Sequence, residues 1–425
     1  MPHSRSEWQR RVGRKDPTHR GTRATFWVWW LARGVGGNPR SGVVAYFDYN
    51  ATTPLSAVAK AAWVQAAEEA WQNPSSPHRA GVRVGLRLQA AREKVAMMVD
   101  SKPDRVVFTG GATESANGIV AHLAHTLSAD AKVAVSPTEH PCLVAAIGAN
   151  FPRERVVVLP VDQNGIVTEA AIKAALADAA IKAVFVMAAN NETGVLQPWE
   201  KIATVCRDAG VAYICDASQW LGKLPGAGLG AADWVFCAAH KFGGPKGVGF
   251  LLRPTGETGF RVRPGGSQEN GQRAGTVDFP GIAAMVAALG EVEQTKVLHE
   301  SERVRTRDAF EREITRRLPG VKIVAASAER FWNTVALIMP HGENHRWVAR
   351  LDKCHIEVST GSACSSGKEA PSHVLAAMGM SGAEMRRVIR ISAGWATTAQ
   401  EWQELADALV VVAPETQPAS GVISI

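Results

Sequence analysis

Three short segments of this 425-residue chain carry side chains that could act together on a phosphorylated ligand. In segment 108–114, two glycines separate an apolar strand from a predicted helix, and the N–H groups at a helix N-terminus can bind phosphate. Asp216 follows the apolar run 213–215, at the edge where open α/β sheets bind ligands. Lys241 closely follows the next apolar run, and partial desolvation there favours the neutral amine that a Schiff base needs. Taken singly, these features are at least as typical of a plain strand-to-helix turn, a helix-capping aspartate and a surface lysine.

Together, a phosphate cradle, an acid at one strand end and a lysine at the next meet the requirements of pyridoxal 5′-phosphate (PLP). The lysine would bond to the cofactor, and the acid would keep the pyridine nitrogen protonated so that the ring accepts electrons. The combination therefore favours a PLP site formed by Asp216, Lys241 and the glycine turn.

The segment 361–367 (GSACSSG) places Cys364 among small and polar residues, which predicts an exposed, mobile loop. A structural cysteine prefers apolar neighbours, so Cys364 is a candidate reactive thiol, provided that nearby positive charge stabilises the thiolate. The cysteines form no CxxC pair and no zinc-like spacing with histidine, so no metal site is expected. Cys206, Cys215 and Cys237 lie in or beside apolar runs and are predicted to pack as small hydrophobic side chains.

Short apolar runs that alternate with helical periodicity predict the sheet that positions these residues. The runs lack polar alternation, as expected for parallel strands that are covered on both faces. We predict strands at 106–108, 133–135, 156–159, 183–187, 211–215, 234–237 and 248–252. Between them, helical patterns occur at 84–98, 117–127, 143–151, 169–179 and 202–209. The alternation indicates an α/β sheet with right-handed crossovers.

The pattern changes after about residue 276, which predicts a second, smaller α+β domain. A helical stretch over 277–318 precedes predicted strands at 321–324, 334–339 and 388–392, and helices near 346–352, near 372–378 and after the Thr398/Glu401 capping box. We assign residues 56–296 to a large PLP-binding domain. Residues 297–425 together with 46–55 form the predicted small domain, and residues 1–45 a disordered basic extension.

The formal net charge of +7 belongs to the N-terminal segment and not to the body of the chain. Residues 1–45 hold nine Lys and Arg side chains against two acidic ones, so residues 46–425 are neutral overall. The apolar run 26–32 is far shorter than the roughly 20 residues that span a bilayer. We therefore expect a cytoplasmic protein with no membrane partner and no specific nucleic-acid partner. An organellar matrix is the alternative if residues 1–45 are a transit peptide.

Beyond these separate signals, the sequence resembles the cysteine desulfurases of the NifS/IscS type, which are class V aminotransferases of PLP fold type I. The resemblance runs from about Tyr46 to Thr398 and rests on segments that follow one another in family order. They are 47–54 (FDYNATTP), 73–78 (NPSSPH), 112–115 (ATES), 139–141 (EHP), 190–194 (NNETG), 216–219 (DASQ), 240–241 (HK), 268–276 (QENGQRAGT), the Cys364 loop with 371–375 (PSHVL), and Arg390. It implies an α/β fold with a mostly parallel-sheet large domain and a smaller α+β domain.

The resemblance also implies a role for each matching residue. Lys241 would bond to PLP and later move a proton at the substrate Cα. The other implied PLP contacts are stacking by His140, pairing of the ring nitrogen with Asp216, a bond from Gln219 to the phenolic oxygen, and phosphate binding by Ala112, Thr113 and His240. Thr276 would reach the phosphate of the other subunit, which implies a homodimer. Asn191 and Arg390 would bind the substrate carboxylate, for which a guanidinium fork is well suited.

The implied substrate is L-cysteine. The Cys364 thiolate would attack the substrate sulfur, L-alanine would leave, and a persulfide would stay on Cys364 for a sulfur-acceptor protein in iron–sulfur cluster or thio-cofactor biosynthesis. The alternatives are a selenocysteine lyase or another class V PLP aminotransferase, and a PLP-binding interaction protein without turnover.

Three positions depart from the family pattern. Ala238 stands where a phosphate-binding serine is usual, which removes a hydrogen bond worth about 1.5–3 kcal/mol to an ionised partner. Asn270 replaces an arginine and Ser267 replaces a glycine. The chain also ends at Ile425, without the C-terminal extension with which housekeeping members dock iron–sulfur scaffolds, so a generic or specialised acceptor is as plausible as a scaffold.

Overall fold

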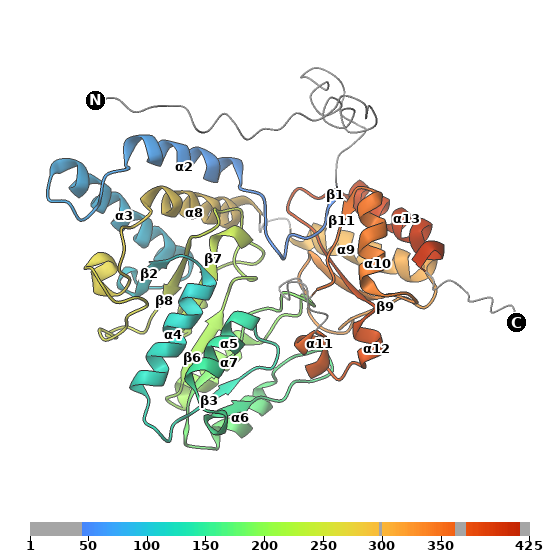
Figure 1. Cartoon of the computed structure of the whole chain (residues 1–425), viewed down its shortest axis with the longest axis horizontal. Helices are drawn as coiled ribbons and strands as arrows, with labels where there is room; N and C mark the ends of the chain where they lie inside the picture. The colour runs from blue at the N-terminus through green and yellow to red at the C-terminus, as the bar shows by residue number, and fades with distance from the viewer. Residues whose placement is uncertain (1–44, 297–299, 362–370, 417–425) are drawn as a thin grey trace, which may run out of the picture. The chain divides into compact units, whose positions relative to one another are not determined.

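A seven-stranded sheet is the centre of the computed structural model, which describes residues 45–296, 300–361 and 371–416 (Figure 1). Its strands are β2 (Val106–Thr109), β3 (Lys132–Val135), β4 (Val156–Val158), β5 (Ile181–Phe185), β6 (Ala212–Asp216), β7 (Trp234–Ala238) and β8 (Gly249–Leu252). They lie in the order β2-β8-β7-β6-β5-β3-β4, and the contiguous pairs from β7 to β4 are parallel. The predicted α/β fold with a mostly parallel sheet is therefore confirmed.

Strand β8 departs from the parallel pattern expected for the apolar runs, because it runs antiparallel to both β2 and β7. Only residues 239–248 connect β7 to β8. A parallel return needs a crossover of roughly a dozen residues or more, so the chain turns back directly beside β7. The returning segment carries the short 3₁₀ helix η4 (Ala239–Lys241), which contains the predicted cofactor lysine.

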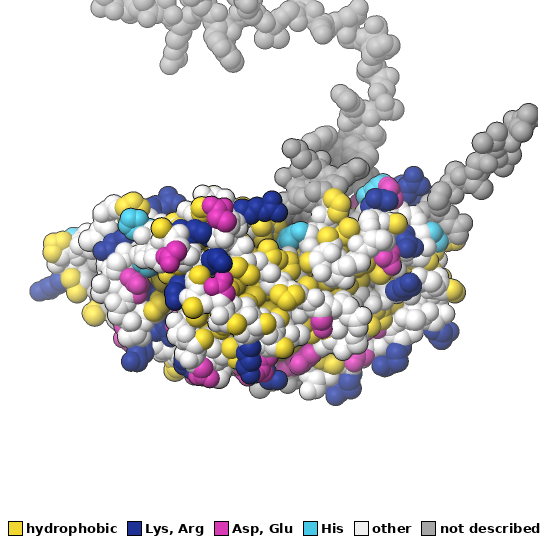
Figure 2. Space-filling view, turned by 90° about the horizontal axis from the view of Figure 1, so that it is seen from below, with side chains coloured by type: hydrophobic (Ala, Val, Ile, Leu, Met, Phe, Trp, Pro, Cys, Tyr) yellow, Lys and Arg dark blue, Asp and Glu magenta, His cyan; other side chains and the backbone are white. Residues whose placement is uncertain are grey.

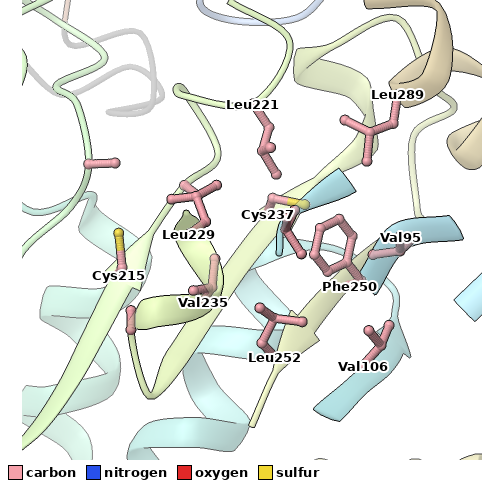
Figure 3. Close-up of a cluster of buried hydrophobic side chains, with 14 of the residues drawn as sticks. Val95, Val106, Cys215, Leu221, Leu229, Val235, Cys237, Phe250, Leu252 and Leu289 are labelled. Carbon is pink, nitrogen blue, oxygen red and sulfur yellow. The ribbon is translucent and has the colours of Figure 1, made fainter. Parts of the chain in front are cut away.

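Helices cover both faces of the sheet because the strands are apolar on both sides. One face packs against α3 (Arg79–Met98), α7 (Trp199–Asp208) and α8 (Phe279–Glu291), and Figure 3 shows part of this core. The other face packs against α4 (Ala112–Thr126) and α5 (Pro141–Asn150). As predicted, Cys206, Cys215 and Cys237 are buried in the first core, and burial raises the pKa of each thiol.

Two helical regions differ from the sequence prediction. Helix α2 (Ala57–Glu69) has no predicted counterpart, because its alanine-rich sequence shows little apolar periodicity. The stretch 277–318, predicted as one long helical region, contains α8, a π-helical turn over Val292–Lys296 and α9 (Glu300–Arg317). The remaining helix of this half of the chain, α6 (Glu169–Leu176), lies where the pattern predicts it.

The later part of the chain forms a smaller antiparallel sheet in the order β12-β10-β9. Its strands are β9 (Lys322–Ile323), β10 (Thr334–Ile338) and β12 (Val388–Ser392), and its helices are α10 (Asn344–Lys353), α11 (His373–Ala377), α12 (Gly382–Met385) and α13 (Ala399–Thr416). β1 (Ala45–Tyr46) pairs with β11 (Ile356–Glu357), and Asp48 bridges to Ser392. The N-terminal segment therefore joins the smaller sheets, while the exact domain boundaries remain predictions.

The surface of the described residues carries charges of both signs. In the face shown in Figure 2, Lys and Arg side chains are interspersed with Asp and Glu around hydrophobic ones, as expected for a body of balanced charge. Within the described ranges, no helix combines the length and apolar character that crossing a bilayer demands. The predicted extension 1–45 lies outside the described residues except for Ala45, and Cys364 lies outside them as well.

Candidate active site

A cavity of about 450 Å³ lies where the carboxyl ends of β5, β6 and β7 meet the N-terminal ends of α4 and α5. Ligands bind at this edge of open α/β sheets, where the ends of parallel strands converge. The predicted site residues that line it are Ala112, Thr113, His140, Asn191, Asp216, Gln219, His240 and Lys241. Residues that are distant in the sequence are thus brought to one place.

Lys241 is held at the cavity wall by the backbone of the N-terminal segment. Its Nζ donates hydrogen bonds to the carbonyl oxygens of Asn50 at 2.6 Å and Ala51 at 2.9 Å. Thr53 fixes this segment against η4, because its N–H and its hydroxyl both donate to the His240 carbonyl at 2.9 Å. The amine is therefore placed by the convergence of two chain segments that lie nearly 200 residues apart.

Asp216 provides a buried acid at the end of β6. Burial raises the pKa of its carboxyl, and the opposing influences are hydrogen bonding from Ser218 and the nearby His140 and Lys241. The Ser218 backbone N–H donates to Asp216 Oδ1 at 2.8 Å. A carboxyl that has lost its water is stabilised as an anion by any cation placed next to it.

His140 caps the N-terminus of α5, and its Nδ1 accepts a hydrogen bond from the Cys142 N–H at 3.2 Å. Burial lowers the pKa of the ring, with Asp216 acting in the opposite direction. In the neutral ring that burial favours, an accepting Nδ1 leaves the proton on Nε2. The ring therefore enters the cavity in a fixed orientation and a fixed tautomer.

Glu139, which precedes His140 in the chain, is fully buried. Burial, followed by the charge of Asp216, raises the pKa of its carboxyl well above the usual range. Its Oε1 accepts the Met187 N–H at 2.6 Å. Its backbone carbonyl contacts His373 Nε2 at 2.8 Å. This residue thus connects α5 to the strand end after β5 and to α11.

An anion cradle forms where the Gly110–Gly111 turn enters α4. Gly111 is the N-cap residue with φ of +130°, and it brings no side chain to cap the helix. Gly111, Ala112 and Thr113 line the cavity at the start of α4, so the positive end of the helix lies at the cavity wall. Ala238 lines the same end, and a Cβ built on Gly111 would lie 4.0 Å from the Ala238 Cβ.

His240 stands at this end of the cavity, with Nδ1 3.1 Å from the Thr52 hydroxyl. Burial, followed by the charges of Lys241 and Lys246, lowers the pKa of its ring to about 4. Lys246 lines the cavity beside it. Because the cationic neighbours disfavour a second positive charge, an anion bound here would raise the pKa of His240 toward its usual value.

Arg390 reaches the rim from β12 and is almost completely buried. Its Nη2 donates to Asp48 Oδ1 at 2.6 Å, and its Nη1 donates to the carbonyl oxygens of Asn191 at 3.1 Å and Gly361 at 3.2 Å. Arg390 does not itself line the 450 Å³ cavity, whereas Asn191 does. The structure thus places the guanidinium directly behind the cavity edge and pairs it with Asp48.

Thr276 lies apart from the other predicted residues. It is exposed and lines a separate depression of about 170 Å³ together with Glu269 and Arg273. Gly247 and Val248 border both this depression and the main cavity. Within a single chain, Thr276 is therefore adjacent to the cavity and not part of its wall.

The segment 362–370, which contains Cys364, lies outside the described residues, but the residues on either side of it converge. A Cβ built on Gly361 would lie 3.7 Å from Glu192 Oε2, and the Ser372 hydroxyl donates to the same oxygen at 2.6 Å. Glu192 directly follows Asn191, which lines the cavity. The described residues that flank the segment, Gly361 and Ser372, are thus both next to Glu192.

Two residues of the site carry no role in the sequence prediction. Asn50 lies in the segment 47–54 that supports the family resemblance. It accepts a hydrogen bond from Lys241 through its backbone carbonyl, which every residue type has, so the sequence could not indicate this contact. Lys223 is buried behind Gln219. One sequence signal could have indicated Lys223: it follows the predicted site residue Gln219 by four positions, in a weakly polar segment.

Comparisons with known proteins identify relatives over most of the chain. The family model described as aminotransferase class-V matches residues 45–405. The chain is 34% identical over 373 residues to cysteine desulfurase IscS of Dictyoglomus turgidum, covering 86% of this chain and 93% of the relative. It is also 34% identical over 373 residues to a cysteine desulfurase of Cereibacter sphaeroides, covering 86% and 94%. A solved NifS-like protein superposes with a TM-score of 0.78 at 28% identity, covering 88% of this chain and 100% of that chain.

Proposed function

The chain belongs to the aminotransferase class V family, and from this membership we propose that it is a PLP-dependent cysteine desulfurase that converts L-cysteine to L-alanine. The observation that carries the proposal is the convergence of Lys241, Asp216, His140 and the N-terminus of α4 on one cavity. Two relatives with about a third of their residues in common with this chain bear the name cysteine desulfurase.

The residues of the cavity fit both the ring nitrogen and the phosphate of PLP. The protonated ring nitrogen would supply the cation that the buried Asp216 carboxyl needs. The phosphate would occupy the cradle of Ala112 and Thr113 next to His240 and Lys246. A cavity of about 450 Å³ is in the usual range for a small-molecule site. The missing hydroxyl at Ala238 leaves the phosphate with one partner fewer.

When bound, PLP supplies an aldehyde that bonds to an amino group and a ring that accepts electrons from the substrate Cα. Lys241 would hold PLP through its aldehyde and would move the proton at the substrate Cα. The carbonyl oxygens of Asn50 and Ala51 hold its Nζ at the wall. His140 would stack on the ring, and because burial lowers the pKa of its imidazole, the neutral side chain would not compete with the protonated ring nitrogen for the Asp216 carboxylate.

The substrate carboxylate would bind at the cavity edge lined by Asn191, with Arg390 directly behind it. The Arg390 guanidinium is already oriented by the carbonyl oxygens of Asn191 and Gly361. Its bond to Asp48 must open or be shared when a second carboxylate arrives. A planar fork with several N–H donors can serve both acceptors, which a lysine could not do with the same geometry.

The sulfur transfer is assigned to Cys364. Its thiolate attacks the sulfur of the bound cysteine, an S–S bond forms and the Cβ–S bond breaks. The electron pair of the broken bond stays with the substrate carbon, which takes up a proton and becomes the methyl group of alanine. The positions of Gly361 and Ser372 support this role, because these flanking residues both lie against Glu192, the neighbour of the cavity residue Asn191.

The persulfide on Cys364 then passes its outer sulfur to an acceptor protein, in iron–sulfur cluster or thio-cofactor biosynthesis. The separate position of Thr276 supports a homodimer in which this residue completes the phosphate site of the other subunit. A cytoplasmic location, or an organellar one if residues 1–45 are a transit peptide, belongs to the same proposal.

The direct test is turnover of L-cysteine by the purified, PLP-loaded protein in the presence of a thiol, with alanine and sulfide both quantified. Cys364→Ala should abolish desulfuration and leave the visible absorption of the bound cofactor intact. Cys354→Ala is the matched control, because Cys354 is exposed and does not line the cavity. Absence of alanine from the wild type, or full activity of Cys364→Ala, would contradict the proposal.

A substrate panel separates the alternatives. Preference for selenocysteine indicates a lyase for that substrate, and keto-acid formation indicates an aminotransferase. Cofactor binding without turnover of any amino acid indicates a non-catalytic PLP protein.

A further inference from the structure

Lys223 is a buried lysine for which the reaction described above has no use. The residue is 2% exposed, and burial, followed by the charges of Lys241 and Arg390, lowers its pKa well below the usual range. Among the salt bridges of the described residues, none pairs it with a carboxylate. Its Nζ lies 5.1 Å from the centre of the Phe331 ring. Burying an amine without a carboxylate partner costs free energy, so the hydrogen bonds of Lys223 must offset part of that cost.

Those hydrogen bonds go to a single residue. Lys223 Nζ donates to the side-chain Oε1 of Gln219 at 2.6 Å and to the backbone carbonyl of Gln219 at 3.1 Å. On the other side of the amide, Gln219 Nε2 donates to the Asn50 carbonyl at 2.9 Å. A carbonyl oxygen can only accept, so the amide oxygen of Gln219 faces Lys223 and its NH₂ group faces the cavity side.

The orientation leaves a donor available to a ligand. The NH₂ group of an amide has two hydrogens, and the Asn50 carbonyl takes one of them. Gln219 lines the cavity, and the same Asn50 carbonyl accepts from Lys241 Nζ at 2.6 Å. The order of contacts is therefore Lys223, Gln219, Asn50 and Lys241, with the second N–H of Gln219 beside the cofactor lysine.

We propose that Lys223 is a positioning residue of this site: it locks the Gln219 amide so that its NH₂ group donates to the phenolic oxygen of bound PLP. The inference rests on the proposed function, since it needs PLP in the cavity. Without Lys223, the Asn50 carbonyl alone orients the amide, so the orientation that presents the NH₂ group to the cofactor is held less tightly. The phenolate then loses part of its stabilisation.

The proposal makes a spectroscopic prediction. A hydrogen bond to the phenolate weakens its hold on the proton of the neighbouring Schiff-base nitrogen, so wild-type protein should lose that proton at a lower pH. Lys223→Met keeps the length of the side chain and removes its donors. We expect the pH midpoint of the visible cofactor band to rise by about one unit, the size that follows from losing a hydrogen bond to an ionised oxygen. The charged groups that act on Lys223 are Lys241 and Arg390, and both are retained.

A double-mutant cycle tests whether Lys223 acts through Gln219. Gln219→Leu should raise the midpoint by a similar amount, and adding Lys223→Met to it should change little more. Lys60→Met, a lysine exposed on α2, is the control and should keep the wild-type midpoint. An unchanged midpoint in Lys223→Met would overturn the proposal, and so would a fully additive double variant.

Gln219→Glu keeps the test decisive if Lys223→Met does not fold, because it leaves Lys223 in place with a carboxylate partner. It replaces the NH₂ donor by an acceptor, so the midpoint must rise at least as far as in Gln219→Leu. A wild-type midpoint in Gln219→Glu would show that this amide does not face the phenolic oxygen. These titrations need bound PLP and not turnover, so failure of the wild type to desulfurate cysteine would refute the proposed function separately.

Discussion

At the scale of single residues, burial decides what each titratable group of the site can do. Asp216 and His140 lie in the same cavity, yet burial raises the pKa of the carboxyl and lowers that of the imidazole. Both shifts favour the neutral form in the protein without cofactor. A protonated pyridine nitrogen between them would restore the charge of Asp216 without charging His140, which is the arrangement that the proposed chemistry requires.

Replacing Ala238 by serine should strengthen cofactor binding. In Ala238→Ser, the added hydroxyl would lie at the phosphate end of the cavity and regain a hydrogen bond worth about 1.5–3 kcal/mol. We expect the dissociation constant for PLP to fall about tenfold or more, measured by titrating cofactor-free protein with PLP. Ser267→Gly, which reverts a departure outside the cavity, should leave the constant unchanged. Equal affinities of Ala238→Ser and wild type would show that Ala238 does not face the phosphate.

The low pKa of His240 predicts an acid sensitivity of the cofactor-free protein. Burial lowers the pKa of the ring from about 6.5 in the unfolded chain to about 4 in the folded protein, so the unfolded state binds more protons between these values. The stabilisation from neutral His240 is complete above pH 6.5 and is lost as the pH falls toward about 4.

In thermal melts across this range, wild type should therefore lose more stability than His240→Asn, which does not titrate there. His345→Asn is the control, because His345 is exposed, and its melting curve should follow that of wild type. Parallel curves for wild type and His240→Asn would argue against the low pKa.

At the scale of elements, the anion cradle depends on a close approach between the Gly110–Gly111 turn and β8. A Cβ on Gly249 would clash with the Cys237 carbonyl oxygen and would lie 2.7 Å from the Gly111 Cα. The hydrogen-bonded pair β7–β8 holds this glycine in place. Because β8 returns antiparallel, the short loop that carries Lys241 and the strand that supports the cradle are one continuous unit.

Gly249→Ala should therefore damage both folding and cofactor binding. We expect a loss of about 1–3 kcal/mol in unfolding free energy, together with weaker PLP binding. Gly148→Ala is the matched control, because it lies in α5 with no atom within 4 Å of an added Cβ. It should gain about 0.5–1 kcal/mol from reduced backbone freedom. Chemical denaturation of both variants measures the contrast, and equal stabilities would refute it.

The ion pair between Arg92 of α3 and Glu269 supports the segment that carries Thr276. Arg92 donates to both carboxylate oxygens of Glu269 at 2.8 and 2.9 Å, and Glu269 also accepts the Phe108 N–H at 2.9 Å. The two side chains are 9% and 1% exposed. Glu269 adopts a positive φ of 49°, so this pairing holds a strained turn next to β2.

Removing one partner should leave a buried charge uncompensated. Arg92→Met is expected to cost about 3–5 kcal/mol of unfolding free energy. Arg87→Met, on the same helix, removes an exposed pair with Glu69 and should cost less than about 1 kcal/mol. Urea denaturation distinguishes the two, and similar costs for both variants would contradict the assignment.

At the scale of the whole molecule, the excess positive charge and the residues of the candidate site lie in different parts of the chain. Every motif of the site lies after residue 45, where acidic and basic residues balance, and the excess of +7 lies before it. We expect a chain that begins at residue 45 to keep full cysteine turnover and to lose non-specific binding to DNA at low salt. Loss of turnover, or DNA binding that survives the truncation, would assign the N-terminal segment or the body a different role.

Much of the fold and most of the site could be predicted from the sequence because the relevant signals are local. Apolar runs located all seven strands of the large sheet to within one or two residues. The strand-to-helix turn at Gly110–Gly111 and the acid at the end of β6 were recognised from neighbouring residues alone. Helix α2 was missed because an alanine-rich sequence carries no periodic signal.

The sequence by itself determined the α/β class, the family and the residue types of the site. Only the tertiary structure decided which of them meet: the antiparallel return of β8, the pairing of Arg390 with Asp48, and the contacts of Lys223 and Lys241 on either side of Gln219 and Asn50. The contact between Lys241 and Asn50 joins positions 191 residues apart, and that between Arg390 and Asp48 joins positions 342 apart. Contacts of this kind arise from the packing of distant segments. A backbone carbonyl is the same in every residue type, so no local sequence pattern can indicate which carbonyl accepts a hydrogen bond.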